Sequence, residues 1–240
     1  MSNMSKLWRL YKMGGITPAV ASMFNPQSAQ QMAFIRSVMK EQRKNSMYDI
    51  PLQKLDTVVF DLETTGFSPY NGDEIISIGA VGMTGGQLLE EQSYYSLVKP
   101  EKAIPDAVVR LTGIDNDEAG RAPELIVVLK EFLEFVNHRV LVVHGSGHDK
   151  HFLNSALWKT SKVNLSHRFI DCLILAQRLE PKRGSYDLDT LLADYGIEAN
   201  GRHHALYDAG MTAQLWKCLL AETLRRDVHT LGDLYDFLSR

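Results

Sequence analysis

Two acidic side chains at the end of a short apolar run, Asp61 and Glu63, have the types and spacing to do chemistry together. The run at residues 58–60 is β-branched and aromatic, which is typical of a buried strand. Residues two apart on a strand share a face, so both carboxylates can point at one place. Carboxylates held close repel each other unless a proton or a cation intervenes, and Mg²⁺ prefers oxygen ligands. The pair fits a divalent-cation site, although a solvated strand end would show the same pattern.

Two further acids occur downstream in comparable places. Asp149 follows the strand-like run 141–143 and a few small residues, and an amphipathic stretch begins beside it. Asp208 lies near the start of a second amphipathic stretch, which a pair of histidines, His203 and His204, precedes. The recurrence of acids after strand-like runs favours the metal site over the solvated strand end.

Together these segments resemble the DEDDh family of 3′–5′ exonucleases, which includes the proofreading subunit of bacterial DNA polymerase III, exonuclease X, RNase T and oligoribonuclease. The three family motifs match residues 60–66, 142–149 and 203–209, in the family's order. The second motif departs from the family at Gly145 and His148, where an asparagine and an aromatic residue are usual. The resemblance implies an α/β, ribonuclease-H-like fold with a mixed five-stranded sheet flanked by helices.

Hydrolysis of a phosphodiester needs an activated water and a stabilised leaving oxygen, which two divalent cations can supply. The resemblance implies that Asp61, Glu63, Asp149 and Asp208 are catalytic acids that hold two such cations, with Asp149 acting mostly through water. Mg²⁺ or Mn²⁺ suits a set of ligands made only of oxygen.

The general base that the resemblance implies is His203, five residues before Asp208, because imidazole titrates near neutral pH. A related subfamily has a tyrosine four residues before the acid, but that position is His204 here, and Tyr207 is adjacent to the acid. We expect His204 to be a surface or supporting residue.

The resemblance also places substrate contacts, and it implies DNA with a single-stranded or frayed 3′ end as the substrate, with RNA as the alternative. Residues just after the first acid would hold the terminal 3′-hydroxyl, and Ile114 would pack on the terminal base, unless it is ordinary core. Base stacking of this kind tolerates any sequence. The implied substrate-binding residues are Leu62, Thr64, Thr65, Gly66, Ile114 and His144.

Other readings of these residues fit less well. His144, His148 and His151 have zinc-like spacings, but the first ends a predicted strand whereas the others begin a helix. The His148-Asp149 pair also occurs in HD-domain phosphohydrolases, whose all-helical fold conflicts with the predicted strands. A member that only binds nucleic acid would have lost catalytic acids, and this chain retains them.

Composition favours a cytoplasmic enzyme. The chain has 240 residues and a net charge of −3. Its two cysteines, Cys172 and Cys218, lack the spacing of a disulfide or metal framework. The sequence contains no apolar run of 18 residues and no recognisable secretory signal, so we expect no membrane segment.

The predicted organisation has three parts. Residues 1–50 form a basic, mainly helical extension of net charge +5, residues 51–225 the exonuclease domain, and residues 226–240 a short C-terminal helix. The extension has Trp8, Tyr11 and Phe24, which favour docking on the body; its basic residues fit either phosphate contacts or a solvated helix, and its protein partner is unknown. The predicted strands lie near residues 55–61, 74–83, 87–98, 139–144 and 168–171.

Overall fold

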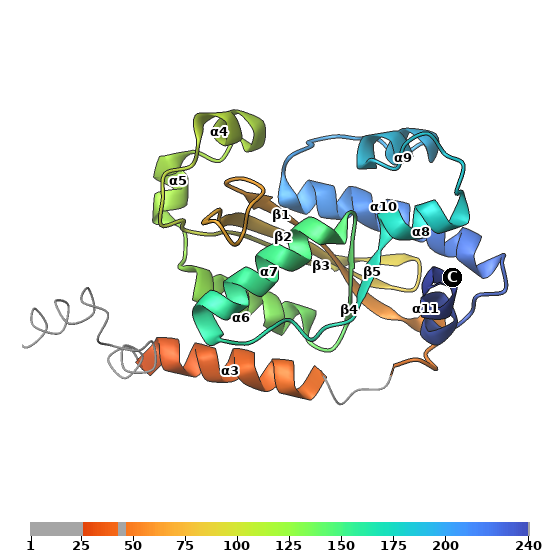
Figure 1. The fold of residues 1–240 in the computed structure, drawn as a ribbon, viewed down its shortest axis with the longest axis horizontal. Helices are drawn as coiled ribbons and strands as arrows, with labels where there is room; N and C mark the ends of the chain where they lie inside the picture. The colour runs from red at the N-terminus through yellow and green to blue at the C-terminus, as the bar shows by residue number, and fades with distance from the viewer. Residues whose placement is uncertain (1–25, 43–46, 240) are drawn as a thin grey trace, which may run out of the picture.

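The computed structural model describes residues 26–42 and 47–239, and within these ranges the chain forms one mixed sheet with helices on both faces (Figure 1). The strands run in the order β3-β2-β1-β4-β5. The pairs β1–β2 and β2–β3 are antiparallel, and the pairs β1–β4 and β4–β5 are parallel. The predicted mixed five-stranded sheet is therefore confirmed. The strands are β1 (Asp56–Thr64), β2 (Ile75–Thr84), β3 (Gln87–Leu97), β4 (Val140–Val143) and β5 (Phe169–Asp171).

One short helix in the described part of the chain has no signal in the sequence pattern. The helix α5 was not predicted, because its six residues bury a single side chain, Ala119, and so carry no periodic apolar signal. Its start is fixed locally instead, by the Asp115 carboxylate, which accepts a hydrogen bond from the backbone N–H of Glu118 at 2.7 Å. The helices are α3 (Pro26–Gln42), the 3₁₀ turn η1 (Leu52–Lys54), α4 (Asp106–Thr112), α5 (Asn116–Arg121), α6 (Leu125–Val136), α7 (Ser146–Ser161), α8 (Cys172–Leu179), α9 (Leu188–Asp194), α10 (Ala205–Leu224) and α11 (Leu231–Ser239).

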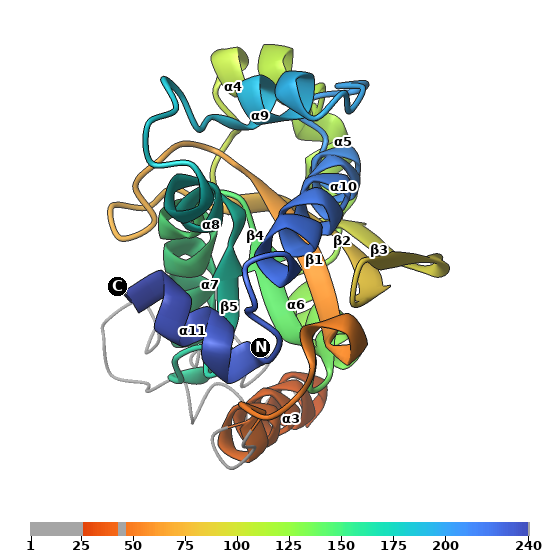
Figure 2. The same ribbon diagram turned by 90° about the vertical axis from the view of Figure 1, so that its right-hand side faces the viewer.

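Each face of the sheet has its own core (Figure 1 and Figure 2). The central strand β1 contributes Val59 to one core, where α8, α9, α10 and α11 pack, and Val58 and Phe60 to the other, where α3, α6 and α7 pack. This alternation is the period of two that a strand imposes on its side chains. The odd-numbered residues of β1 therefore face α10.

Helix α3, from the predicted extension, packs on the body. Its residues Ile35 and Met39 are buried in the core formed with α6 and α7. The Arg36 side chain donates to the Ser161 carbonyl at 2.9 Å, and Gln42 donates to the Asn137 carbonyl at 2.7 Å. The predicted docking residues Trp8, Tyr11 and Phe24 lie outside the described residues, and the division of the chain at residues 50 and 225 stays a prediction.

Local contacts determine the turn between β2 and β3 and the start of the C-terminal helix. The two-residue turn Gly85-Gly86 joins β2 to β3, with a positive φ of 56° at Gly85. Thr230 caps α11: its hydroxyl accepts from the backbone of Asp233 at 3.1 Å, and the Asp233 carboxylate accepts from the backbone of Thr230 at 2.9 Å. Among the described residues, no helix is both long and apolar enough to span a membrane.

Candidate active site

Strand β1 presents Asp61 and Glu63 on its α10 side, the face to which Val59 also points. Asp61 pairs with Gly79 of β2, and the regular register of the two strands ends in an irregularity between Glu63 and Thr64. Both acids precede that irregularity, so the strand's period of two holds for them, and their carboxylates share one face as the sequence predicts.

Gly79 allows the first turn of α10 to reach the sheet. A side-chain carbon at this position would lie 2.5 Å from the Ala205 carbonyl oxygen and closer still to the Leu206 nitrogen, so only glycine permits this approach. Since Gly79 is the partner of Asp61, the start of α10 lies directly over the first acid. Sequence reasoning missed this role, because a glycine inside a strand indicates a close approach without saying what approaches.

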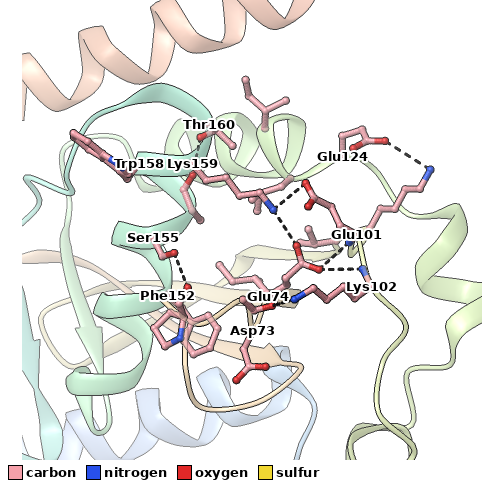
Figure 3. Close-up of a pocket in the computed structure, with 18 of the residues that line it drawn as sticks. Asp73, Glu74, Glu101, Lys102, Glu124, Phe152, Ser155, Trp158, Lys159 and Thr160 are labelled. Carbon is pink, nitrogen blue, oxygen red and sulfur yellow. Dashed lines mark hydrogen bonds and ion pairs between the residues drawn. The ribbon is translucent and has the colours of Figure 1, made fainter. Parts of the chain in front are cut away.

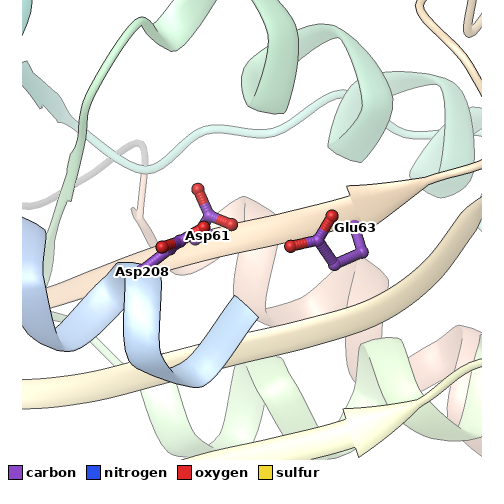
Figure 4. Close-up of side chains that lie close together, drawn as sticks. All are labelled: Asp61, Glu63 and Asp208. Atoms are coloured by element: carbon purple, nitrogen blue, oxygen red, sulfur yellow. The ribbon is translucent and has the colours of Figure 1, made fainter. Parts of the chain in front are cut away.

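Three carboxylates meet at this contact (Figure 4). Oxygens of Asp61, Glu63 and Asp208 all lie within 4.8 Å of one another. Burial, followed by repulsion from Asp149 and the other two acids, raises the pKa of Asp61 well above its usual value. Burial, followed by repulsion from Asp208, raises the pKa of Glu63 to about 7. The cluster thus has the ligands and the excess negative charge that a divalent cation would satisfy.

A cation from the chain itself, Arg202, already lies at the cluster. Its guanidinium is 2.5 Å from Oδ1 of Asp208 and 2.6 Å from Oδ1 of Asp189. Its charge acts against the rise in the pKa of Asp61 and of Glu63. The sequence places Arg202 beside the third motif, but only the fold reveals that it links α9 to a candidate metal ligand.

The fourth predicted acid, Asp149, is buried in the first turn of α7. It lies outside the group of three oxygens but close enough to raise the pKa of Asp61. Its own pKa is raised, first by burial and then by the charge of Asp171. The Asp171 carboxylate accepts from the backbone N–H groups of Gly145 at 3.0 Å and Ser146 at 2.6 Å, which holds the turn from β4 into α7.

The two histidines of the third motif have different surroundings. His203 has a positive φ of 63°, and its backbone N–H donates to Oδ2 of Asp208 at 3.0 Å. His204 is stacked between the rings of Tyr95, at 4.6 Å, and Tyr207, at 4.4 Å between centroids. Among the described residues, none forms a hydrogen bond with the His203 imidazole, whereas two tyrosine rings enclose the His204 ring.

The predicted substrate residues fall into two groups. Thr64 donates its hydroxyl to the Gly66 carbonyl at 2.7 Å, and Thr65 exchanges hydrogen bonds of 2.9 Å with the backbone of Glu74, so the loop after β1 is fixed internally. Their neighbour Phe67 is 88% exposed, with its ring 5.8 Å from that of His148. Three other predicted residues contribute to packing or are partly enclosed: Leu62 is core, Ile114 is buried with Ile76, Ile104 and Ala119, and His144 is partly buried with a lowered pKa because of that burial.

A cavity of about 760 Å³ lies behind this loop, and Glu74 forms part of its wall (Figure 3). Its lysines have partners: Lys159 contacts Glu74 at 3.0 Å and Glu101 at 2.9 Å, and Lys99 contacts Glu124 at 3.7 Å. None of the clustered carboxylates lines this cavity. It is therefore separate from the acidic site.

The geometry can be compared with known proteins. The family model described as Exonuclease (RNase_T) matches residues 58–216, which include all three predicted motifs. The chain belongs to this exonuclease family. The match confirms the resemblance inferred from the motifs and the predicted class of enzyme.

Several curated relatives are DNA polymerases III of the PolC type. The protein from Thermotoga petrophila is 35% identical over 184 residues, and that from Bacillus subtilis is 32% identical over 184 residues. These alignments cover 77% and 76% of this exonuclease chain but only 13% of each relative. The chain thus corresponds to a small part of the length of these relatives.

Solved structures share the fold at lower identity. Exonuclease X in complex with 5′ overhanging duplex DNA has a TM-score of 0.58 and 21% identity, covering 77% of this chain and 99% of that one. The nuclease domain of 3′hExo, a DEDDh family member bound to rAMP, has a TM-score of 0.61 and 22% identity, covering 76% and 94%. E. coli Exonuclease I in complex with single-stranded DNA has a TM-score of 0.62 and 18% identity, covering 77% and 43%.

Proposed function

We propose that this chain is a metal-dependent 3′–5′ exonuclease that removes nucleotides from single-stranded or frayed 3′ ends of DNA. The observation that carries the proposal is the convergence of Asp61, Glu63 and Asp208, from β1 and α10, within 4.8 Å. Acids that lie so close together and are partly buried lower the stability of the fold, because their charges repel each other and lose water. Their presence at one place therefore favours a catalytic role.

The residues fit divalent cations. All donors in the cluster are carboxylate oxygens, the ligands of Mg²⁺ and Mn²⁺, and the raised pKa values of Asp61 and Glu63 mark a deficit of positive charge. Asp61, Glu63 and Asp208 would hold the cations directly, with Asp149 contributing through water. Bound there, the cations would supply the activation of water and the stabilisation of charge on the phosphate that the hydrolysis needs.

His203 acts as the general base in this proposal. Its backbone N–H donates to Asp208 at 3.0 Å, so the backbone of the proposed base is attached to one of the acids, which supports this role. The ring accepts a proton from the attacking water as the oxygen bonds to phosphorus. The leaving 3′-oxygen of the preceding nucleotide departs, and a nucleotide with a 5′-phosphate is released.

The choice of DNA as the substrate is supported by the relatives and by the rim of the site. Several curated relatives are DNA polymerases III, and two of the structural neighbours are DNA complexes. At the rim, the exposed ring of Phe67 directly follows Gly66 and could stack on a base. Stacking on an aromatic ring is independent of sequence, as an enzyme that shortens any 3′ end requires.

Degradation of matched DNA and RNA oligonucleotides, labelled at the 3′ or the 5′ end, tests the proposal. With Mg²⁺ or Mn²⁺ we expect immediate release of the 3′ label as a mononucleotide and a ladder from 5′-labelled DNA, with slower loss of RNA. EDTA and Asp61→Asn should each abolish the reaction, because each removes the cation or one of its ligands. Faster degradation of RNA would overturn the choice of substrate, and full activity of Asp61→Asn would overturn the assigned site.

A further inference from the structure

The segment at residues 201–204, which leads into α10, is fixed at almost every residue. The Arg202 guanidinium pairs with both Asp189 and Asp208. The backbone N–H of His203 donates to Asp208, and His203 itself adopts the left-handed conformation that non-glycine residues rarely take. Such a conformation persists only when its surroundings determine it.

The His204 ring attaches the segment to two other elements. It lies between Tyr95 of β3 and Tyr207 of α10, nearly parallel to both, with interplanar angles of 19° and 29°. His204 is also the N-cap residue of α10, but its side chain makes no capping hydrogen bond. The ring therefore contributes stacking, not capping, and connects the sheet, the segment and the helix.

Tyr207 holds the segment at a second point. A side-chain carbon on Gly201 would lie 2.6 Å from the Tyr207 ring, so the ring lies directly against this glycine, whose φ is 71°. Tyr207 thus contacts the segment on both sides of His203, at Gly201 and at His204. Tyr207 is nevertheless 55% exposed. Burial of apolar surface therefore does not account for the position of its ring against the segment.

We propose that the three-ring stack Tyr95–His204–Tyr207 is a positioning device that fixes the backbone of His203 and so aims its imidazole at the acidic cluster. This inference rests on the proposed role of His203 as the general base. Tyr95 and Tyr207 act through His203 and do not touch the reacting atoms. A general base must stay within hydrogen-bond reach of its proton, so a loosened segment lowers turnover and leaves DNA binding unchanged.

The test is a double-mutant cycle between Tyr207 and His203, measured as kcat and KM on a 3′-labelled single-stranded DNA. Tyr207→Ala should lower kcat by about ten- to a hundredfold, the scale expected for misplacing a catalytic group by about 1 Å, with KM unchanged. Tyr207→Phe keeps the ring and should restore the wild-type kcat. In the His203→Ala background, Tyr207→Ala should change kcat by less than about twofold, because no base remains to be positioned.

Two measurements separate positioning from a general loss of structure. Gln214→Ala, at an exposed position of the same helix, should leave kcat unchanged. Mn²⁺ binding followed by calorimetry should be the same for Tyr207→Ala and wild type, since Tyr207 makes no recorded contact with the carboxylates among the described residues. Tyr95→Ala, on a different strand, should reproduce the kcat defect of Tyr207→Ala and likewise add little to His203→Ala.

Several outcomes would overturn the inference, and all but the last leave the proposed function intact. If the losses in kcat of Tyr207→Ala and His203→Ala multiply in the double mutant, or if Tyr207→Ala raises KM at constant kcat, the exposed ring of Tyr207 binds the substrate instead. Weaker Mn²⁺ binding would mean that the ring holds Asp208. If His203→Ala alone had wild-type turnover, the general base would be wrong, and the positioning role would fall with it.

Discussion

The approach of α10 to the sheet at Gly79 makes a quantitative prediction about how the fold builds the acidic cluster. In Gly79→Ala, the added methyl group would lie 2.5 Å from the Ala205 carbonyl oxygen and closer to the Leu206 nitrogen. Both are backbone atoms of the segment that starts α10, and a backbone cannot rotate away as a flexible side chain can. The helix start must therefore move off the sheet, and Asp208, one turn into α10, must move with it.

The expected cost can be estimated from these contacts. Inserting a methyl group into a close-packed site costs about 1–3 kcal/mol, and a clash with backbone places Gly79→Ala near the upper end. For a domain of this size, a loss of about 3 kcal/mol corresponds to a fall in Tm of about 6–12 °C. A displacement of Asp208 by about 1 Å should also lower kcat by about a hundredfold.

Thermal unfolding and hydrolysis of labelled DNA measure both effects on one sample. The control is Gly120→Ala, in the exposed helix α5, where an added methyl group meets nothing within 4 Å. The free energy of unfolding of that variant should rise by about 0.5–1 kcal/mol, because alanine is more favourable than glycine within a helix, and its activity should be unchanged. A Gly79→Ala protein with the wild-type Tm and kcat would refute the argument that this contact sets the position of Asp208.

Three further predictions follow from the described contacts. Because the pKa of Glu63 is raised from 4.5 to about 7, the folded metal-free protein holds this proton more tightly than the unfolded chain, so Glu63 should contribute a loss of about 3 kcal/mol in stability as the pH rises from 4.5 to 7. Melting curves in EDTA should show a decline that is smaller by about this amount in Glu63→Gln, where the raised pKa values of Asp61 and Asp149 cause the remaining decline, and equal declines in the two proteins would contradict the argument. His203→Ala should lower kcat by about 10²–10⁴-fold and His204→Ala by less, with little change in DNA affinity for either; the reverse order in single-turnover assays would make His204 the base. Ile35→Ala, which empties a fully buried position of α3, should cost about 2–5 kcal/mol in urea unfolding with kcat unchanged, and an unaltered midpoint would mean that α3 does not support the body.

The sequence predicted those parts of the fold that local pattern determines. Apolar runs located the strands. Asp61 and Glu63 are two residues apart on β1, and this spacing was sufficient to place both carboxylates on one face. Asp208 was recognised from motif order, not from geometry, since nothing local indicates that the start of α10 lies over β1.

The rest depended on contacts between segments distant in the chain. Arg202 was not identified because its partners Asp189 and Asp208 come together only when α9 lies beside α10. Asp171 was missed for the same reason: its carboxylate binds the backbone of Gly145 and Ser146, 26 and 25 residues earlier. Short capped elements such as α5 also escaped, because one buried residue gives no periodicity.

The acidic cluster shows where the requirements of folding and of chemistry diverge within one strand. On the α6 and α7 side, β1 buries Val58, Phe60 and Leu62, an uninterrupted apolar row that stabilises the sheet. On the α10 side, the row changes after Val59 to Asp61 and Glu63, and the raised pKa values record the unfavourable energy of that change. The fold tolerates this unfavourable free energy because the other face of β1 and the rest of α10 are packed in apolar cores, which stabilise it. Arg202 compensates only part of the charge, so the site retains a net attraction for cations while the surrounding fold keeps its shape.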